Sequence, residues 1–160
     1  MREKIQLKRS EDYYLKVLLK ETKLKTIMTS PVVCIDLDAS FKEVPKKFEE
    51  FRIRHLPVVT GGKKLVGLIS QRDLFRLQPP RKTLDGELVY DQDALDGIIL
   101  KHVMVQEPFF MKENDSLGDA IVAIVEKKYG CIPIVNEKME IQGMVTQMDM
   151  LKVSAQIFQE

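Results

Sequence analysis

The residues best suited to chemistry belong to a seven-residue motif that occurs twice: glycine, two apolar residues, serine or threonine, two further residues and aspartate. The copies are residues 67–73 and 143–149. The glycine lets a ligand approach the backbone closely, and the hydroxyl residue opens a helix whose free N–H groups attract phosphate. A carboxylate one turn later accepts two hydrogen bonds, which suits the paired hydroxyls of a ribose. The motif therefore predicts a nucleoside phosphate site in each copy.

The same residues also have a purely structural interpretation. Ser70 with Asp73, and Thr146 with Asp149, match the capping box, in which a hydroxyl and a carboxylate satisfy backbone N–H groups at a helix start. A chain that arose by duplication would repeat its caps as well as its sites. The sequence leaves both alternatives open, a pair of ligand sites and a pair of helix caps.

No arrangement for catalysis or metal binding can be assembled from the other residues. His55 and His102 occupy non-equivalent positions, and no paired-histidine or Cys-x-x-Cys spacing occurs. A nucleophile needs a base and an orienting group; Cys34 and Cys131 have neither, and their apolar neighbours predict burial. Residues 61–64 lack the phosphate-loop pattern and predict a hairpin turn. We therefore expect no catalytic residue, no metal and no enzyme activity.

Each motif ends a longer repeat, because the two halves of the chain register at an offset of 76 residues (143 minus 67). Residues 56–59 then match residues 132–135, and only a one-residue slip near Pro31 and Pro108 disturbs the register. A period this long indicates one small supersecondary unit made twice.

Hydrophobic periodicity and turn residues predict the order β-α-β-β-α in each unit. An extended opening is followed by a capped helix, two strands and a second helix. In the first unit we expect strands at 31–37, 56–60 and 65–69 and a helix at 71–77. In the second unit we expect strands at 108–112, 132–136 and 140–145 and a helix at 147–157. Capping signals at Ser40 with Glu43, and at Ser116 with Asp119, mark the first helix of each unit. Pro45 is expected to kink or shorten its helix.

The fold class expected is α+β (α/β-type), with two units packed sheet to sheet as a pseudo-two-fold pair, since one unit alone buries too little surface. Residues 1–23 form a helical extension, with Tyr14, Leu15, Leu18 and Leu19 on one side of an amphipathic helix at 10–23. The repeats are expected at 24–77 and 100–157. The acidic connection at 78–99 is long, so we expect a mobile loop or a partner surface.

Composition excludes several classes of function. The chain has 160 residues, 44% hydrophobic and 31% charged, with a net charge of +1. Without a basic excess, nucleic-acid binding is disfavoured. No stretch approaches the ~18 apolar residues of a membrane span, and the charged start is no secretory signal. Two cysteines give no disulfide framework, so we expect a reducing, cytoplasmic setting.

The order of these motifs resembles the CBS domain, named after cystathionine β-synthase. It is carried by Met28-Thr29-Ser30-Pro31, the capped helix, residues 55–59 and residues 67–73 in the first unit. In the second unit, the resemblance is carried by residues 130–135 and 143–149. The pair resembles a Bateman module, in which two CBS units form a disc-like pseudo-dimer. The resemblance implies adenosine nucleotides (AMP, ADP or ATP), or less often S-adenosylmethionine, in two clefts, a homodimer, and signalling to an unidentified protein partner.

The resemblance also assigns roles to residues. Asp73 and Asp149 are expected to bind ribose hydroxyls, and Ser70 and Thr146 to contact phosphate or ribose. The adenine is expected against Thr29, Pro31, Val32, Pro57 and Val58 in the first site, and against Pro133 and Ile134 in the second.

The two sites are expected to differ. The second opening, residues 105–109, lacks the hydroxyl of the first and carries an acid beside an expected anion site. The second unit has Gly130, Cys131 and Met148 at positions where the first unit has basic residues. The basic residues of the first unit are Arg54, His55 and Arg72. Because cations favour phosphate, we hypothesise that the first unit's site prefers the more phosphorylated ligand. Alternatively, Arg54 and Arg72 are solvated surface residues. The alternative function is a constitutive dimer or adaptor without a nucleotide.

Overall fold

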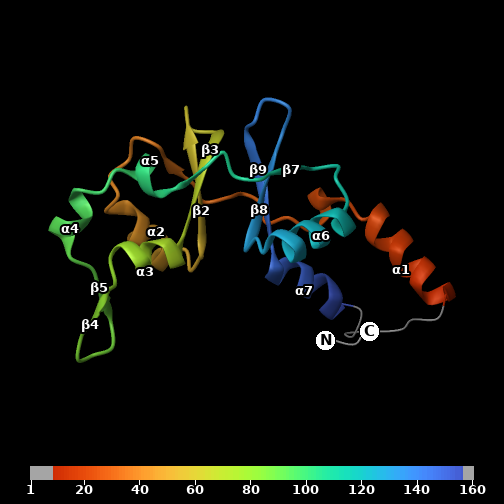
Figure 1. Cartoon of the computed structure of the whole chain (residues 1–160), viewed down its shortest axis with the longest axis horizontal. Coiled ribbons are helices and arrows are strands. Elements are labelled where there is room, and N and C mark those ends of the chain that lie inside the picture. The colour runs from red at the N-terminus through yellow and green to blue at the C-terminus, as the bar shows by residue number, and fades with distance from the viewer. Residues whose placement is uncertain (1–8, 157–160) are drawn as a thin grey trace.

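The computed structural model describes residues 9–156, which form two similar units side by side (Figure 1). The first unit contains β1 (Ile35–Asp36), α2 (Glu43–Glu50), β2 (His55–Thr60), β3 (Lys64–Ser70) and α3 (Gln71–Leu77). The second contains β6 (Val105–Gln106), β7 (Met111–Lys112), α6 (Leu117–Lys127), β8 (Cys131–Val135), β9 (Ile141–Thr146) and α7 (Gln147–Gln156). The expected α/β class and the repeated order of elements are confirmed.

Two further segments accompany the units. The helix α1 (Arg9–Glu21) and the short η1 (Leu24–Thr26) precede the first unit. Between the units lie β4 (Arg81–Lys82), β5 (Leu88–Val89), α4 (Gln92–Asp96) and α5 (Leu100–Val103). Residues 1–8 of the expected extension, and the expected end of the last helix at Ile157, lie outside the described residues. No helix within residues 9–156 is long and apolar enough to cross a membrane.

Each unit contains the predicted hairpin of two strands. β2 and β3 are antiparallel, and β1 lies parallel to β2; β7, β8 and β9 repeat this pattern. The turn between β2 and β3 needs positive φ at both central residues, and Gly61 and Gly62 supply it, at 58° and 77°. The predicted hairpin turn is therefore confirmed.

The segment that opens each repeat crosses to the other repeat. We call residues 28–34 and 104–110 the opening segments. β6, in the second, pairs with β3 of the first unit, with Leu68 opposite Val105. Reciprocally, Thr29 and Met144 exchange backbone hydrogen bonds of 2.9 and 3.0 Å. Both pairs obey the 76-residue offset, because 29 plus 76 is 105 and 68 plus 76 is 144, so the units form a pseudo-two-fold pair.

The tips of the two hairpins also meet on the pseudo-two-fold axis. Lys64 lies opposite Glu140, its own counterpart at the 76-residue offset. The N–H of Leu65 donates to the carbonyl of Met139 at 2.9 Å, and the N–H of Ile141 donates to that of Lys63 at 3.0 Å. Strands from both repeats are therefore joined by backbone hydrogen bonds at the hairpin tips as well as at the opening segments.

The motif glycines are required by this crossing. A Cβ at Gly143 would lie 2.4 Å from the Sδ of Met28, and a Cβ at Gly67 would lie 2.2 Å from the Sδ of Met104. The sequence predicted that each glycine leaves its backbone open to a ligand. In the structure, the group that approaches each glycine closely is a methionine from the other repeat's opening segment, and not a ligand.

Each unit has its own apolar core. Leu56, Val58 and Ile69 are fully buried in the first, and Ile132, Ile134 and Val145 in the second. Leu100 and Met104 extend the first core, although they come from the start of the second repeat. Their burial ties the second opening segment to the first unit.

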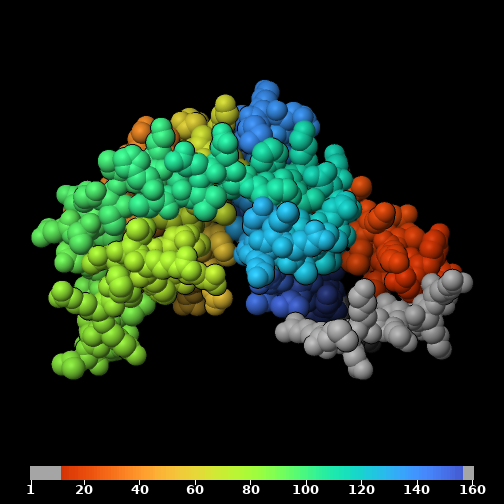
Figure 2. Space-filling model, in the orientation of Figure 1, coloured from red at the N-terminus to blue at the C-terminus, as the bar shows by residue number. Residues whose placement is uncertain are grey.

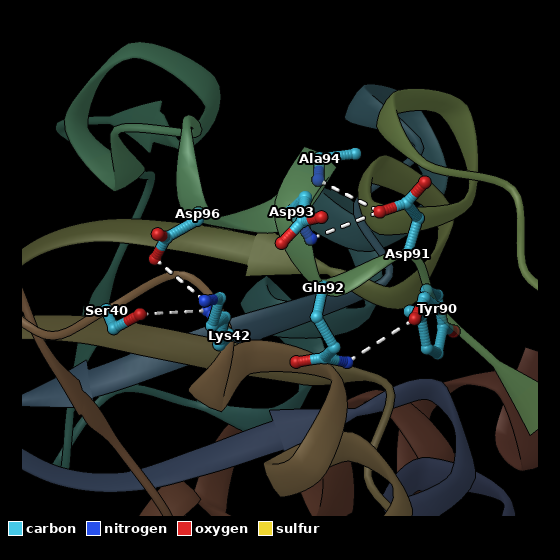
Figure 3. Close-up of polar contacts among 8 residues, drawn as sticks. All are labelled: Ser40, Lys42, Tyr90, Asp91, Gln92, Asp93, Ala94 and Asp96. Carbon is cyan, nitrogen blue, oxygen red and sulfur yellow. Dashed lines mark hydrogen bonds and ion pairs between the residues drawn. The ribbon is translucent and has the colours of Figure 1, made fainter.

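The second half of the connection packs against the first unit, whereas residues 81–89 are exposed, where a mobile loop or a partner surface stays a prediction. Leu95 of α4 is fully buried in the first core. The carboxylate of Asp91 accepts from two N–H groups at the start of α4, and Lys42 forms an ion pair of 3.0 Å with Asp96 (Figure 3). The β4–β5 hairpin stands away from the body, with Leu84 fully exposed (Figures 1 and 2).

Two details of the helices differ from the sequence prediction. α2 begins at Glu43, and its N-cap is Lys42, with no side-chain cap, so the predicted Ser40–Glu43 box is wrong. The late start places Pro45 in the first turn, where its missing N–H is tolerated. Phe51 follows the helix and is exposed. Ser116, in contrast, caps α6 as predicted and accepts from the N–H of Asp119.

The apolar side predicted for the first helix is only partly covered. Leu19 contacts Gly118 at the start of α6, so this part of α1 packs against the second unit. Tyr14, Leu15 and Leu18 remain exposed.

The contact between Gly143 and Met28 gives a stability prediction. Gly143→Ala should lower the free energy of unfolding by about 1–3 kcal/mol, the usual cost of overpacking, because the new Cβ also meets the Cγ and Cβ of Met28. In Gly143→Ala with Met28→Ala, the combined loss should be smaller than the sum of the single losses. Chemical denaturation measures all three. Gly97→Ala is the control, since its Cβ would meet nothing within 4 Å; additive losses would contradict the account.

Candidate functional site

Both predicted Ser/Thr-to-Asp motifs are helix caps in the structure. At α3, the N–H of Asp73 donates to Ser70 Oγ at 3.2 Å, and the N–H and Oγ–H of Ser70 donate to Asp73 Oδ2 at 2.9 and 2.5 Å. At α7, the N–H of Asp149 donates to Thr146 Oγ1 at 3.3 Å, and the N–H and Oγ1–H of Thr146 donate to Asp149 Oδ2 at 2.8 and 2.6 Å. The structural interpretation is therefore confirmed for both motifs.

Capping leaves one oxygen of each carboxylate for other work. The caps use Oδ2 of each aspartate, and within residues 12–156 Oδ1 of Asp73 accepts no hydrogen bond. Oδ1 of Asp149 lies 3.4 Å from Thr29 Oγ1 and 3.7 Å from Lys152 Nζ. Asp149 is only 7% exposed and its Oδ1 already has these two partners, whereas Asp73 is half-buried. A cap that uses Oδ2 alone is compatible with a binding role, so the two interpretations do not compete.

The structure changes how the predicted residues are grouped. Thr29 was expected to share a site with residues of its own repeat, and it lies instead beside Thr146 and Asp149 of the second repeat. The cause is the crossing of the opening segment, since Thr29 pairs with Met144, two residues before Thr146. We call Thr29, Thr146 and Asp149 site A.

The pseudo-symmetric group is site B, which contains Val105, Ser70 and Asp73. Val105 pairs with Leu68, two residues before Ser70. Site B therefore combines the first repeat's cap with the second repeat's opening segment, which carries no hydroxyl. At the one-residue slip, Glu107 is exposed and adopts a positive φ of 48°.

The remaining predicted wall residues divide between exposed and buried positions. Pro31 is exposed and Val32 half-buried, so both are accessible near site A. Pro133 lies on the strand next to Met144, and Pro57 on the strand next to Leu68.

Val58 and Ile134 do not present their side chains to either site. Both are fully buried in the two cores. Any contact that they make with a ligand would therefore involve their backbone.

Positive charge gathers at site B. Arg72 follows the capped Ser70, and the carbonyl of Arg54 accepts from the N–H of Gln71 at 2.9 Å. Both arginine side chains are exposed. The first repeat's cap therefore carries both arginines on exposed side chains, and their preference for a phosphorylated ligand stays a prediction.

His55 lies where the two repeats meet. A Cβ on Gly130 would fall 2.5 Å from its Nε2, so only glycine fits beneath the imidazole. Burial lowers the pKa of His55; Asp73 opposes this shift, and Arg54 and Arg72 add to it. His55 is therefore mainly neutral near pH 7 and sits between a carboxylate and two cations.

Sequence reasoning missed two features of the sites. Lys152 lies three residues after Asp149, a spacing that places both on one helix face, and this signal was available. The crossing of the opening segments had no sequence signal, because the 76-residue offset is the same whether each segment stays with its own repeat or crosses.

The cysteines fit no reactive role. Burial raises the pKa of Cys34 to about 11, against a smaller opposing effect of Lys47, and raises that of Cys131 to about 12. Both thiols are therefore protonated at neutral pH. Across residues 9–156, no three histidine, cysteine, aspartate or glutamate side chains are grouped to hold a metal ion.

The burial of His55 gives a pH prediction. Because its folded pKa lies below the ordinary 6.5, the unfolded chain binds the proton more readily. Stability from neutral His55 is therefore complete above pH 6.5 and is lost as the pH falls towards the folded pKa. The Tm of the wild type should fall more steeply than that of His55→Gln between about pH 7.5 and 5.5. Thermal unfolding in a pH series measures this, with exposed His102 present in both proteins; parallel slopes would contradict it.

Comparison with known proteins identifies one family, whose domain matches two segments of the chain. The CBS domain matches residues 24–79 and residues 100–156. Among curated proteins, MJ1225 of Methanocaldococcus jannaschii is 26% identical over 128 residues, which cover 80% of this chain. The chain spans 45% of the length of MJ1225.

Solved CBS-domain pairs have the same fold. The pair from protein MJ0100, in complex with 5′-methylthioadenosine and S-adenosyl-L-methionine, gives a TM-score of 0.69 at 20% identity and covers 85% of this chain and 98% of that one. CBSX2 of Arabidopsis thaliana gives a TM-score of 0.71 at 22% identity, and the match covers 87% of this chain and 98% of CBSX2. A complex of CBSX2 with AMP gives 0.70 at 20% identity.

Proposed function

The chain belongs to the CBS domain family, with two copies of the domain, and we propose that it is a non-catalytic regulatory module that binds an adenine nucleotide at site A. The observation that carries the proposal is the convergence of Thr29 from one repeat with Asp149 from the other, at 3.4 Å. A ribose placed there would accept from or donate to groups of both repeats. AMP, ADP and ATP are the ligands proposed, with S-adenosylmethionine as a further adenosine compound.

The ligands of structural neighbours support the adenosine part of this proposal. The MJ0100 pair holds 5′-methylthioadenosine and S-adenosyl-L-methionine, and CBSX2 holds AMP. The shared part of these three ligands is adenosine, whereas the groups attached to its 5′ carbon differ. A carboxylate that recognises the ribose hydroxyls is suited to all of them.

Site B is proposed as the second and more cationic site. Oδ1 of Asp73 accepts no hydrogen bond within residues 12–156, and Arg54 and Arg72 flank the cap. Its opening segment offers Val105 in place of Thr29, and Glu107 adds a negative charge nearby. We expect weaker ribose recognition here and a greater dependence on phosphate charge, so Arg72→Ala should affect ATP more than adenosine.

A nucleotide at site A would act on the arrangement of the two repeats. Its contacts span the boundary between them, so it favours whichever orientation brings Thr29 and Asp149 together. A ligand shifts a conformational equilibrium only through its different affinities for the two states. The output proposed is a change in contact with a protein partner or with a second copy of the chain in a homodimer. The protonated, unpaired cysteines suit a reducing compartment such as the cytoplasm.

The second candidate function is a constitutive adaptor that binds no nucleotide. The observation in its favour is that Ser70, Asp73, Thr146 and Asp149 are fully accounted for as helix caps. The two functions differ in whether any adenine ligand stabilises the fold.

A thermal-shift panel separates the two candidates. AMP, ADP, ATP and S-adenosylmethionine are compared with NAD and a cyclic dinucleotide. A ligand at 100 times its Kd should add about 2.7 kcal/mol to the free energy of unfolding, or several degrees of Tm at this size. Thr29→Val should reduce the shift by an adenine ligand, because it removes a hydroxyl beside Asp149 without touching either cap.

The matched control is Thr26→Val, which removes an exposed hydroxyl one turn away that binds only the carbonyl of Lys23. Its ligand shift should equal that of the wild type. No shift by any adenine ligand would establish the adaptor, and an equal loss in both variants would remove Thr29 from the site.

A further inference from the structure

A cleft of about 590 Å³ lies between the repeats, away from the caps of sites A and B. It is formed by the start of β3, the second opening segment and the turn after β8. Ser70, in site B, stands at the other end of β3. In Figure 1 the chain from α5 to β7 passes across both units and forms one side of this region. The volume falls within the ~300–1,000 Å³ typical of small-molecule sites.

The walls of the cleft are apolar. Leu65 and Met104 are buried there, and the other apolar residues of the lining are Leu37, Val66, Pro108, Phe110 and Met139. Met104 also covers Gly67, so this wall is held in place by the packing between the repeats. Such a surface favours the apolar body of a ligand.

The rim of the cleft is cationic. Lys64 and Lys101 are exposed there, and within residues 12–156 neither forms an ion pair. Glu107 is the single acid of the lining, so two positive charges face one negative charge. Lysine ammonium groups above an apolar wall can bind an anionic head while the chain of the ligand is buried.

The apolar and cationic lining of the cleft is not repeated on the opposite side of the pseudo-two-fold axis. At the 76-residue offset, Leu37 corresponds to Glu113, Lys64 to Glu140, and Val66 to Gln142. Phe110 corresponds to Cys34 and Met139 to Lys63. The fold therefore accepts acidic and polar residues at these positions, and the apolar, cationic lining is not required by the fold.

We propose that this cleft binds an organic anion with an apolar body, of the class of medium-chain carboxylates. The cleft shares the second opening segment with site B, but its lining contains neither cap, and binding there requires no nucleotide. The ligand's carboxylate lies at Lys64 and Lys101, and its chain lies along Leu65, Met104 and Phe110. Because the walls come from both repeats, the bound anion holds the second opening segment against β3, next to the strand pairing that forms site B.

Decanoate tests the proposal on the nucleotide-free protein. Isothermal titration should show saturable binding of decanoate, and the cation decyltrimethylammonium should bind at least about tenfold more weakly. Lys64→Glu with Lys101→Glu should weaken decanoate binding at least about tenfold. Leu37→Glu, which introduces the counterpart residue, should also weaken it, and thermal unfolding without ligand should show that each variant folds.

The matched control is Lys25→Glu, since Lys25 is the exposed counterpart of Lys101 on the opposite flank. It should leave decanoate binding unchanged. The proposal is overturned if decanoate does not bind, if decyltrimethylammonium binds equally well, or if Lys25→Glu weakens binding as much as the double substitution does.

Discussion

The backbone pairing of each opening segment with the other repeat's hairpin governs the rest of this structure. Thr29 with Met144, and Val105 with Leu68, join strands that belong to different repeats. Met28 and Met104 then cover Gly143 and Gly67, so the glycines of the repeated motif are needed for packing between repeats. A unit of this size buries too little surface to be stable alone, and the crossing makes each unit's sheet and core depend on the other.

The same crossing decides where binding chemistry is assembled. Each site takes its cap from one repeat and its opening segment from the other, so neither site exists in an isolated repeat. The caps at Asp73 and Asp149 fix the carboxylates through Oδ2, and Oδ1 of Asp149 lies beside Thr29 and Lys152. Divergence between the copies then gives site A a threonine hydroxyl and a lysine, and gives site B two arginines. A duplicated fold thus offers two unlike sites on one symmetric frame.

Much of the fold could be predicted from the sequence because its signals are local. Gly61 and Gly62 fixed a hairpin turn, and Ser116 a helix start, since each acts within a few residues of itself. The box predicted at Ser40 did not form: its hydroxyl accepts the N–H of Lys42, and the helix begins at Glu43. The candidate site residues were chosen from local motifs, whereas their grouping depends on the crossing of the opening segments. Thr29 was expected with its own repeat because the repeat pattern does not state which sheet an opening segment joins. The burial of Leu95 likewise depends on tertiary contacts that an acidic, loop-like composition does not reveal.

The most direct test of the account is a double-mutant cycle on the free energy of AMP binding, measured by isothermal titration. One cycle joins Thr29→Val with Asp149→Asn, and the other joins Thr29→Val with Asp73→Asn. The account predicts a coupling energy above about 0.5 kcal/mol in the first cycle and additivity within about 0.3–0.5 kcal/mol in the second, because Thr29 shares a site only with Asp149. Coupling of Thr29 to Asp73, with none to Asp149, would contradict the crossed assembly of the site.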